Sequence, residues 1–286
     1  MYSNLALSGG ALRGVALLGA IKYLEEKKIF KNFNNYIGSS AGGIILFLLL
    51  IGFTSNEIIN ILKDELKYLM NLNFDNLTNI STKLGIDNGS KNEKILRKYL
   101  YSKTNLGSIT FIEFAKKFGK NLIITGTNLD KHQTDYFCVD TFPDMDIIQA
   151  LLITSCIPFI YEPITFNNDL YIDGGLYSNF PIEYFEKNSN DTLGICINPD
   201  YYNKNDNILN YVNNILFSMM NKLSYDNIYK NKDKYNVCLI SFKTNCYNEI
   251  GFSLTEMEFK IDDKIFKEYT EFGYNEFKQY FETNLN

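Results

Sequence analysis

Short apolar runs alternate with longer amphipathic segments along this chain, and the alternation predicts an α/β fold. Runs that read as strands, some of them buried, cover 4–8, 34–39, 121–129, 134–139, 169–175, 192–198 and 236–242. Segments with helical spacing cover 15–28, 41–52, 55–70, 91–103, 110–119, 146–155, 207–223 and the tail from 255. We therefore expect a central, mostly parallel sheet with helices on both faces.

A chain of 286 residues can bury a substantial core. No internal repeat or Pro/Ser-rich linker divides it, so we expect one domain over residues 1–286. The apolar run 44–53 has about half of the ~20 residues that a membrane-spanning helix needs, and it is expected to be a core helix.

The segment 207–223 carries apolar residues along one helical face. These residues are Ile208, Val212, Ile215, Met219 and Leu223. We expect the face to pack in the core, and the alternative is a lid that faces lipid.

Charge and cysteine content narrow the function classes. The chain has 28 Lys and Arg against 33 Asp and Glu, for a net charge of -5, and it lacks a basic block. This balance disfavours nucleic-acid binding and electrostatic attachment to anionic lipid, so any peripheral membrane contact has to be apolar. Five scattered cysteines and a start without signal-peptide features predict a cytoplasmic protein.

The sequence "GSSAG" places Ser40 between Gly38 and Gly42, after a predicted strand and before the apolar helix. This context is typical of a nucleophile held in a strained turn. The helix N-terminus at Ala41 would favour negative charge near the serine oxygen. A plain surface loop is the alternative.

The glycine-rich turn "SGGALRG" at 8–14 admits several interpretations. Ala11 stands at the middle glycine of a dinucleotide fingerprint, and Val15 and Ala16 stand where a phosphate-binding loop has Lys and Ser or Thr. The interpretations that remain are a tight strand-to-helix turn and an oxyanion hole formed by the amides of Gly10 and Ala11.

Asp173, in "DGG", lies at the end of a predicted strand, where α/β sheets build their sites, although Asp-Gly is also a common turn. The runs 121–129 and 134–139 can pair as a hairpin. His132, the single histidine, lies between them in what we expect to be a solvent-facing turn. The order Ser40, His132, Asp173 also differs from that of the α/β-hydrolases. The base partner of Ser40 is therefore expected to be a carboxylate.

Taken together, "SGGALRG", "GSSAG" and "DGG" resemble the patatin-like phospholipases over about residues 4–181. The resemblance implies a three-layer α/β fold and a Ser–Asp dyad with Ser40 as nucleophile and Asp173 as its base partner. It implies no cofactor and no catalytic metal. The remaining site residues that it implies are the oxyanion residues Gly9, Gly10, Ala11, Arg13 and Gly14, and the elbow residues Gly38, Ala41 and Gly42.

The resemblance also implies a phospholipase A type reaction, in which an acyl-serine forms from a phospholipid or another acyl-ester lipid. A catalytically weak lipid-binding protein and a transacylase are the alternatives. Because an ordinary aspartate is a poor base at neutral pH, we expect Asp173 to be desolvated, with a raised pKa. Ala11 stands where many family members have glycine, and a positive φ there would weaken the site.

The segment before the Asp173 strand is a candidate wall or rim for an acyl groove, and ordinary core packing is the alternative. Its residues are Pro158, Phe159, Ile160 and Tyr161.

Overall fold

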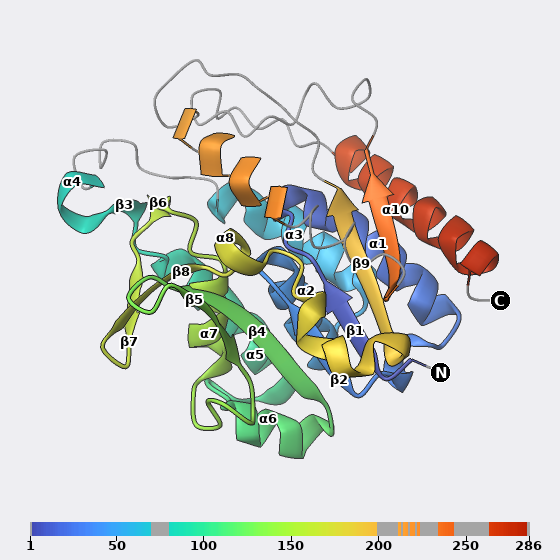
Figure 1. Cartoon of the computed structure of the whole chain (residues 1–286), viewed down its shortest axis with the longest axis horizontal. Helices are drawn as coiled ribbons and strands as arrows, with labels where there is room; N and C mark the ends of the chain where they lie inside the picture. Colours follow the sequence, from blue (N-terminus) through green and yellow to red (C-terminus); the bar gives the residue numbers. More distant parts are fainter. Residues whose placement is uncertain are drawn as a thin grey trace.

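The computed structural model describes residues 2–69, 80–198, 234–242 and 263–284, together with most of residues 211–223 (Figure 1). The strands are β1 (Asn4–Leu7), β2 (Asn35–Gly38), β3 (Gly85–Asp87), β4 (Asn121–Asn128), β5 (Gln133–Phe137), β6 (Phe159–Tyr161), β7 (Ile164–Phe166), β8 (Asp169–Asp173), β9 (Thr192–Asn198) and β10 (Asn236–Ser241). The α-helices are α1 (Val15–Glu26), α2 (Ala41–Leu50), α3 (Ser55–Leu69), α4 (Ile80–Lys83), α5 (Ser90–Thr104), α6 (Phe111–Phe118), α7 (Ile147–Thr154), α8 (Gly175–Ser178) and α10 (Asp263–Asn284). Short 3₁₀ helices are η1 (Ala11–Gly14), η2 (Phe30–Asn32) and η4 (Ile182–Asp191).

The sequence predicted most of these elements, including the β4–β5 hairpin. Clear local signals explain several of them. Thr110 and Glu113 form a capping box at the start of α6, and the Asp146 side chain accepts the Ile148 N–H at the start of α7. The short strands β3, β6 and β7 were not predicted. Parts of the predicted segments, namely residue 70 and residues 207–210 and 255–262, lie outside the described residues.

The central sheet is mixed but mostly parallel, with the strand order β10-β9-β1-β2-β4-β8-β7. The five strands from β10 to β4 run parallel, and β8 then pairs with β4 in the antiparallel direction. β7 and β5 are also antiparallel to their neighbours, while β3 and β6 form a separate two-stranded sheet. The predicted α/β class is therefore correct.

Alternating strand residues divide the core between the two faces of the sheet. In β1, Leu5 and Leu7 join the larger cluster, which includes α1, α2 and α7, whereas Ala6 joins the smaller one. Phe180, together with Ile182 of η4, supplies much of the smaller cluster. One face is thus covered by long helices and the other mainly by a short irregular segment.

Helices α1 and α10 lie side by side, as Figure 1 shows. A Cβ on Gly19 would collide with the Thr270 carbonyl, and a Cβ on Gly273 would collide with the Ala16 carbonyl. Glycine at both places lets the two backbones approach closely, so the amphipathic tail predicted from the sequence joins the core.

The described residues between 211 and 223 are helical, but their expected core face is wrong in part. Ile215, Met219 and Leu223 are 42%, 58% and 48% exposed. Val212 is half-buried, and Ile208 lies outside the described residues. No helix within the described ranges combines the length and the apolar character needed to cross a membrane.

Candidate active site

The turn from β2 into α2 holds Ser40 in a strained conformation. Ser40 has φ 48° and ψ -124°, in the positive-φ region that non-glycine residues seldom adopt. A Cβ on Gly38 would lie 2.6 Å from the Gly42 carbonyl carbon, and a Cβ on Gly42 would lie 2.5 Å from the Ser8 carbonyl oxygen. The two glycines therefore give the strand and the helix the room that a sharp turn requires.

Ser40 and Asp173 meet at the carboxyl end of β2. The Ser40 Oγ donates a hydrogen bond to Asp173 Oδ2 at 2.9 Å. Strand register explains the meeting, because Gly38 of β2 pairs with Ile124 of β4, and Gly126, two residues further on, pairs with Asp173 of β8. Asp173 therefore lies at the height in the sheet of the second residue after Gly38, which is Ser40.

The carboxyl group of Asp173 is almost completely buried, at 3% exposure. Its Oδ1 accepts the Gly175 N–H at 2.7 Å while Oδ2 accepts the Ser40 hydroxyl. Burial raises the pKa of Asp173 to about 7, although both hydrogen bonds act to lower it. The desolvation expected from the sequence is present, and the group is suited to exchanging protons near neutral pH.

Thr154, at the C-terminal end of α7, connects the two segments that carry the dyad. Its Oγ1 accepts the Ser40 N–H at 2.9 Å, and its carbonyl accepts the Gly174 N–H at 3.4 Å. The neighbouring Cys156 carbonyl accepts the Asp173 N–H at 2.9 Å. Sequence reasoning missed Thr154, because a threonine near a helix end carries no signal of a partner 114 residues earlier.

The loop between β1 and η1 lies beside Ser40. A Cβ on Gly9 would be 3.2 Å from the Ser40 Cβ, and a Cβ on Gly14 would be 3.2 Å from the Ala41 Cβ. The Gly9 N–H donates to the Asn179 carbonyl at 2.8 Å, so this amide is already engaged. The other two amides predicted as oxyanion donors belong to Gly10 and Ala11, at the N-terminus of η1. Backbone N–H groups at a helix N-terminus have no acceptor within the helix.

Ala11 has φ 45°, which is the conformation in which its Cβ costs energy. Ala11 thus has the positive φ at which its side chain was expected to weaken the site. Arg13 is half-buried and engaged in contacts of its own.

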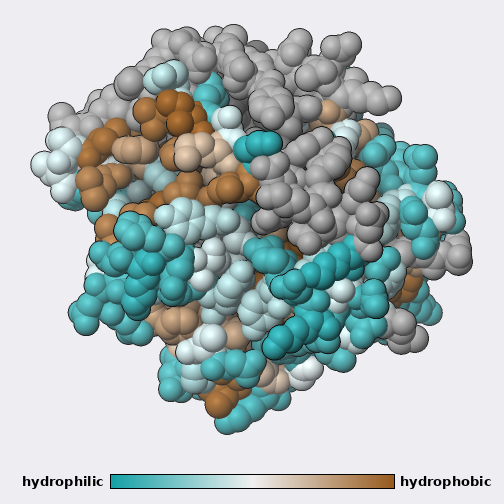
Figure 2. All heavy atoms as spheres, in the orientation of Figure 1, coloured by the Kyte–Doolittle hydropathy of each residue, from teal (hydrophilic) through white to brown (hydrophobic). Residues whose placement is uncertain are grey.

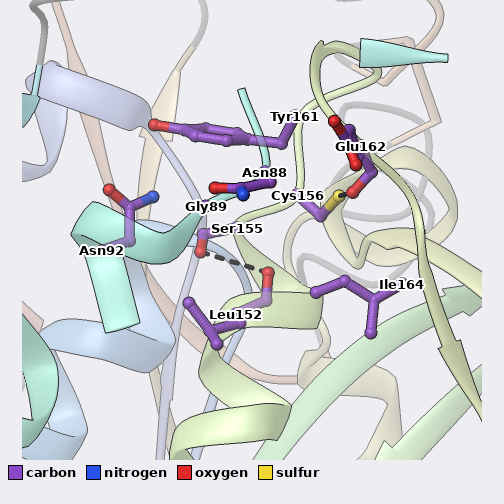
Figure 3. A pocket seen from close by; sticks show the side chains of 9 residues that line it. All are labelled: Asn88, Gly89, Asn92, Leu152, Ser155, Cys156, Tyr161, Glu162 and Ile164. Carbon is purple, nitrogen blue, oxygen red and sulfur yellow. Dashed lines mark hydrogen bonds between the residues drawn. The ribbon is translucent and has the colours of Figure 1, made fainter. Parts of the chain in front are cut away.

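The segment that was expected to line an acyl groove is mostly packed against the protein. Ile160 is 2% exposed, and Pro158, Phe159 and Tyr161 are half-buried. The Tyr161 ring lies over Asn88 at the edge of a small cavity (Figure 3). This cavity has a volume of about 20 Å³, which is room for about one water molecule and not for an acyl chain.

His132 lies in the exposed β4–β5 turn, as predicted, and takes no part in the Ser40–Asp173 pair. Among the residues that the structure describes, no three His, Cys, Asp or Glu side chains gather as metal ligands. The groups that meet at this site are a serine hydroxyl, a carboxyl group and nearby backbone amides.

Known sequences match this chain over the part that carries the site. Residues 5–186 match the patatin-like phospholipase family. The chain is 42% identical, over 185 residues, to "Probable lipid hydrolase 463L" of Invertebrate iridescent virus 6, and the alignment spans 64% of this chain and 62% of that protein. It is 34% identical, over 206 residues, to "Uncharacterized protein R571" of Acanthamoeba polyphaga mimivirus, across 71% of this chain and 67% of that protein.

Solved structures show the same fold at low sequence identity. VipD from Legionella pneumophila superposes with a TM-score of 0.55 at 17% identity, covering 99% of this chain and 67% of VipD. The type III effector ExoU gives a TM-score of 0.54 at 16% identity, covering 99% of this chain and 53% of ExoU. With the family match extending over more than half of its length, this chain belongs to the patatin-like phospholipases.

Proposed function

We propose that this protein hydrolyses fatty acyl esters of phospholipids, a phospholipase A type reaction, with Ser40 as nucleophile and Asp173 as general base. The observation that carries the proposal is the 2.9 Å hydrogen bond from the Ser40 Oγ to a buried carboxyl group whose pKa is raised to about 7. The membership of a lipid-hydrolase family supports an acyl-ester substrate.

In the first half of the reaction, the Ser40 Oγ attacks the ester carbonyl carbon while its proton passes to Asp173 Oδ2. The carbonyl π electrons move to the oxygen, which becomes an oxyanion. When the tetrahedral intermediate collapses, the lysolipid oxygen leaves and takes the proton back from Asp173. The product of this half is an acyl-serine with an ionised Asp173.

In the second half, Asp173 accepts a proton from a water molecule that attacks the acyl-serine carbonyl. Collapse of the second intermediate expels the Ser40 oxygen, which recovers the proton from Asp173. The fatty acid is released, and the dyad returns to its starting state.

Backbone amides beside Ser40 are the proposed oxyanion donors. With the Gly9 amide bonded to Asn179, the proposal assigns this role to the amides of Gly10 and Ala11. Donors fixed in place before the reaction stabilise a developing charge without reorganisation, which is why such a loop contributes strongly to the rate. Arg13 and Gly14 support the loop, Gly14 through its packing against Ala41.

Hydrolysis of position-labelled phospholipids by wild type and Ser40→Ala tests the proposal. Ser40→Ala should lose at least about 10⁴-fold in kcat/KM, because the nucleophile is gone. Ser39→Ala is the matched control: Ser39 is buried, and among the described residues its Oγ has no hydrogen-bond partner, so this variant should keep its fold and its activity. Equal turnover by wild type and Ser40→Ala contradicts the assignment.

A fluorophosphonate probe separates an enzyme from a protein that only binds lipid. It should label wild type and Ser39→Ala but not Ser40→Ala. The positive φ of Ala11 gives the binding alternative its support, and a wild type that stays unlabelled would favour it. Product analysis with and without a glycerol acceptor separates hydrolysis from acyl transfer.

A further inference from the structure

We propose that the outer face of the helical residues between 211 and 223 docks this protein on a zwitterionic lipid surface. The inference rests on the proposed function, because it assigns the surface from which the Ser40–Asp173 site draws its substrate. The face, called here the apolar stripe, consists of Tyr211, Ile215, Met219 and Leu223.

The apolar stripe is a continuous row of exposed side chains. Its members follow one another at intervals of four residues, which places them on one side of a helix. They are exposed by 51%, 42%, 58% and 48%, from Tyr211 to Leu223. A helix on a protein surface ordinarily turns such a row toward the core, so this row is available for another apolar partner.

Another side of the same helical segment reaches the catalytic turn. Leu216 and Met220 are half-buried there. A Cβ on Gly175 would lie 2.8 Å from the Met220 terminal methyl carbon and 2.9 Å from Asp173 Oδ1. Since a helix with its side chains is about 10 Å across, a surface that contacts the stripe would lie about one helix diameter from the dyad.

Other exposed apolar side chains extend the stripe along the same edge of the molecule. Figure 2 shows hydrophobic residues gathered over the helical segment and toward α4 and β3, whereas the opposite end of this face is mainly hydrophilic. Leu84, beside β3, is 53% exposed, and Tyr177, in α8, is 37% exposed. On the face that Figure 2 shows, exposed apolar residues therefore continue from the stripe toward α4 and β3.

Charge decides which partner fits the stripe. Lys222 is the single charged residue in the sequence from 211 to 223, and the whole chain carries a net charge of -5. Attachment through the stripe thus depends on burying apolar side chains and not on attraction to anionic head groups. A zwitterionic bilayer matches these properties and contains the ester that the neighbouring site is proposed to cleave.

A tryptophan reporter tests the docking directly, because the chain contains no tryptophan. Met219→Trp is placed in a Ser40→Ala background, so that the lipid stays intact, and is mixed with phosphatidylcholine vesicles. Its emission should shift to shorter wavelength and be quenched by lipids brominated on the acyl chains, equally at 0.1 M and 0.5 M NaCl. The matched control is Tyr101→Trp in the same background, since Tyr101 is 59% exposed on α5, outside the stripe. It should show neither effect.

Substitution of the stripe tests its contribution. The triple variant Ile215→Gln, Met219→Gln and Leu223→Gln, in the Ser40→Ala background, should sediment with phosphatidylcholine vesicles at least about tenfold more weakly. Tyr101→Gln with Leu106→Gln, a matched pair of exposed apolar residues elsewhere, should bind as before. With Ser40 present, the triple variant should lose turnover of vesicle lipid at least about tenfold relative to turnover of a short-chain soluble ester.

Several results overturn the docking proposal. One is a Met219→Trp emission that does not shift with vesicles, or that is already shifted without lipid. Another is binding that requires anionic lipid and is abolished by salt. A third is a shift that follows protein concentration, which would indicate self-association. Fluorophosphonate labelling of Ser40 distinguishes the two proposals. Labelling without docking removes this inference alone, and docking without labelling removes the proposed reaction alone.

Discussion

The two ends of the parallel strands β1, β2 and β4 have opposite properties. At their amino ends, Asn4, Asn35 and Asn121 stand in register and are joined by hydrogen bonds of 2.8 and 3.3 Å, and Asn4 continues to the Thr192 hydroxyl at 3.1 Å. At the carboxyl end, Ser40 has a strained backbone. A carboxyl group with a raised pKa lies beside it.

This contrast places the polar row that holds the strands together at one end of the sheet and the proposed chemistry at the other. The amino end links neutral amides and a hydroxyl across the strands, an arrangement that holds the strands in register, although among the described residues the buried Asn121 Oδ1 at its end has no hydrogen-bond partner. The carboxyl end keeps an acid in a site that disfavours its ionised form, which costs stability. Substitutions at the two ends should therefore act on different measurements.

The largest effect is expected for Asp173→Asn, which should lower kcat/KM at least about 10³-fold by removing the base. It should also stabilise the protein at pH 8. The native pKa of Asp173 is about 7, and an unfolded aspartate has a pKa near ~3.9, so the native state binds the proton more tightly and its stability falls as the pH rises from about 4 through 7. Asparagine avoids this loss, which amounts to up to about 4 kcal/mol.

Urea unfolding at pH 8 and turnover measured on the same samples check this prediction. Gly175 and Ser40 still find polar partners on an asparagine side chain, so the variant should remain folded. An Asp173→Asn protein that retains turnover would show that Asp173 is not the general base. One that is less stable than wild type at pH 8 would show that the ionised carboxylate does not destabilise the native state.

The next effect is the pH dependence of wild type. Because the proposed reaction needs ionised Asp173, kcat/KM for a soluble ester should approach a tenfold fall for each pH unit well below about 7. Since half of the groups are already protonated at pH 7, the expected fall from pH 7 to pH 5 is about 50-fold. Circular dichroism at pH 5 verifies that the fold persists. A profile that stays flat down to pH 5 would mean that Asp173 ionises like an exposed aspartate.

A smaller loss is expected for Thr154→Val, which keeps the shape of the side chain but removes the acceptor of the Ser40 N–H. The unpaired amide should cost about 1–3 kcal/mol of stability, and the freed turn should lower kcat by about tenfold. Thr154→Ser should restore both, since it supplies the same oxygen. If Thr154→Val and Thr154→Ser behave alike, the hydrogen bond does not position Ser40.

At the other end of the sheet, Asn4→Ala should change stability without changing turnover. It removes the partner of Asn35 and Thr192 in the partly buried asparagine row, so we expect the free energy of unfolding to fall by about 1–3 kcal/mol at unchanged kcat. Asn34→Ala, at an exposed position beside the row, should stay within about 0.5 kcal/mol of wild type. A loss of kcat in folded Asn4→Ala would contradict the separation of the two ends.

The smallest effect is expected for Ala11→Gly. Glycine relieves the positive φ of this residue but increases the entropy of the unfolded chain, and the two changes oppose each other. The free energy of unfolding should therefore change by less than about 1 kcal/mol. A rise in kcat for this variant would identify Ala11 as the residue that slows the site, and a fall would show that the loop needs its side chain.

Most elements of the fold were predictable because their signals are local. The apolar run after Ser40 predicted α2, and the hairpin around His132 followed from two strand-like runs. The β3 and β6 strands were missed because they are only three residues long. Similar amphipathic patterns predicted α10 and the helical segment 211–223, yet α10 packs tightly against α1 while the apolar stripe stays exposed.

The contact between Ser40 and Asp173 was predicted from the sequence, but the way in which the fold brings the two residues together was not. Asp173 was expected at the end of a strand in a mostly parallel sheet. That strand, β8, runs antiparallel to β4, and Asp173 reaches Ser40 through the register of two strand pairs. The role of Thr154 and the engagement of the Gly9 amide depend on hydrogen bonds between segments far apart in the chain.

Residue order alone specifies the alternation of strands and helices, the sharp turn at Ser40 and the family, because spacing, glycine placement and motif order can be read along the chain. Three-dimensional packing sets the distance from Ser40 to Asp173, the burial that raises the pKa of Asp173, and the apolar helix face that stays exposed. Those quantities depend on how sequence-distant segments pack together, and no local pattern of residues encodes them.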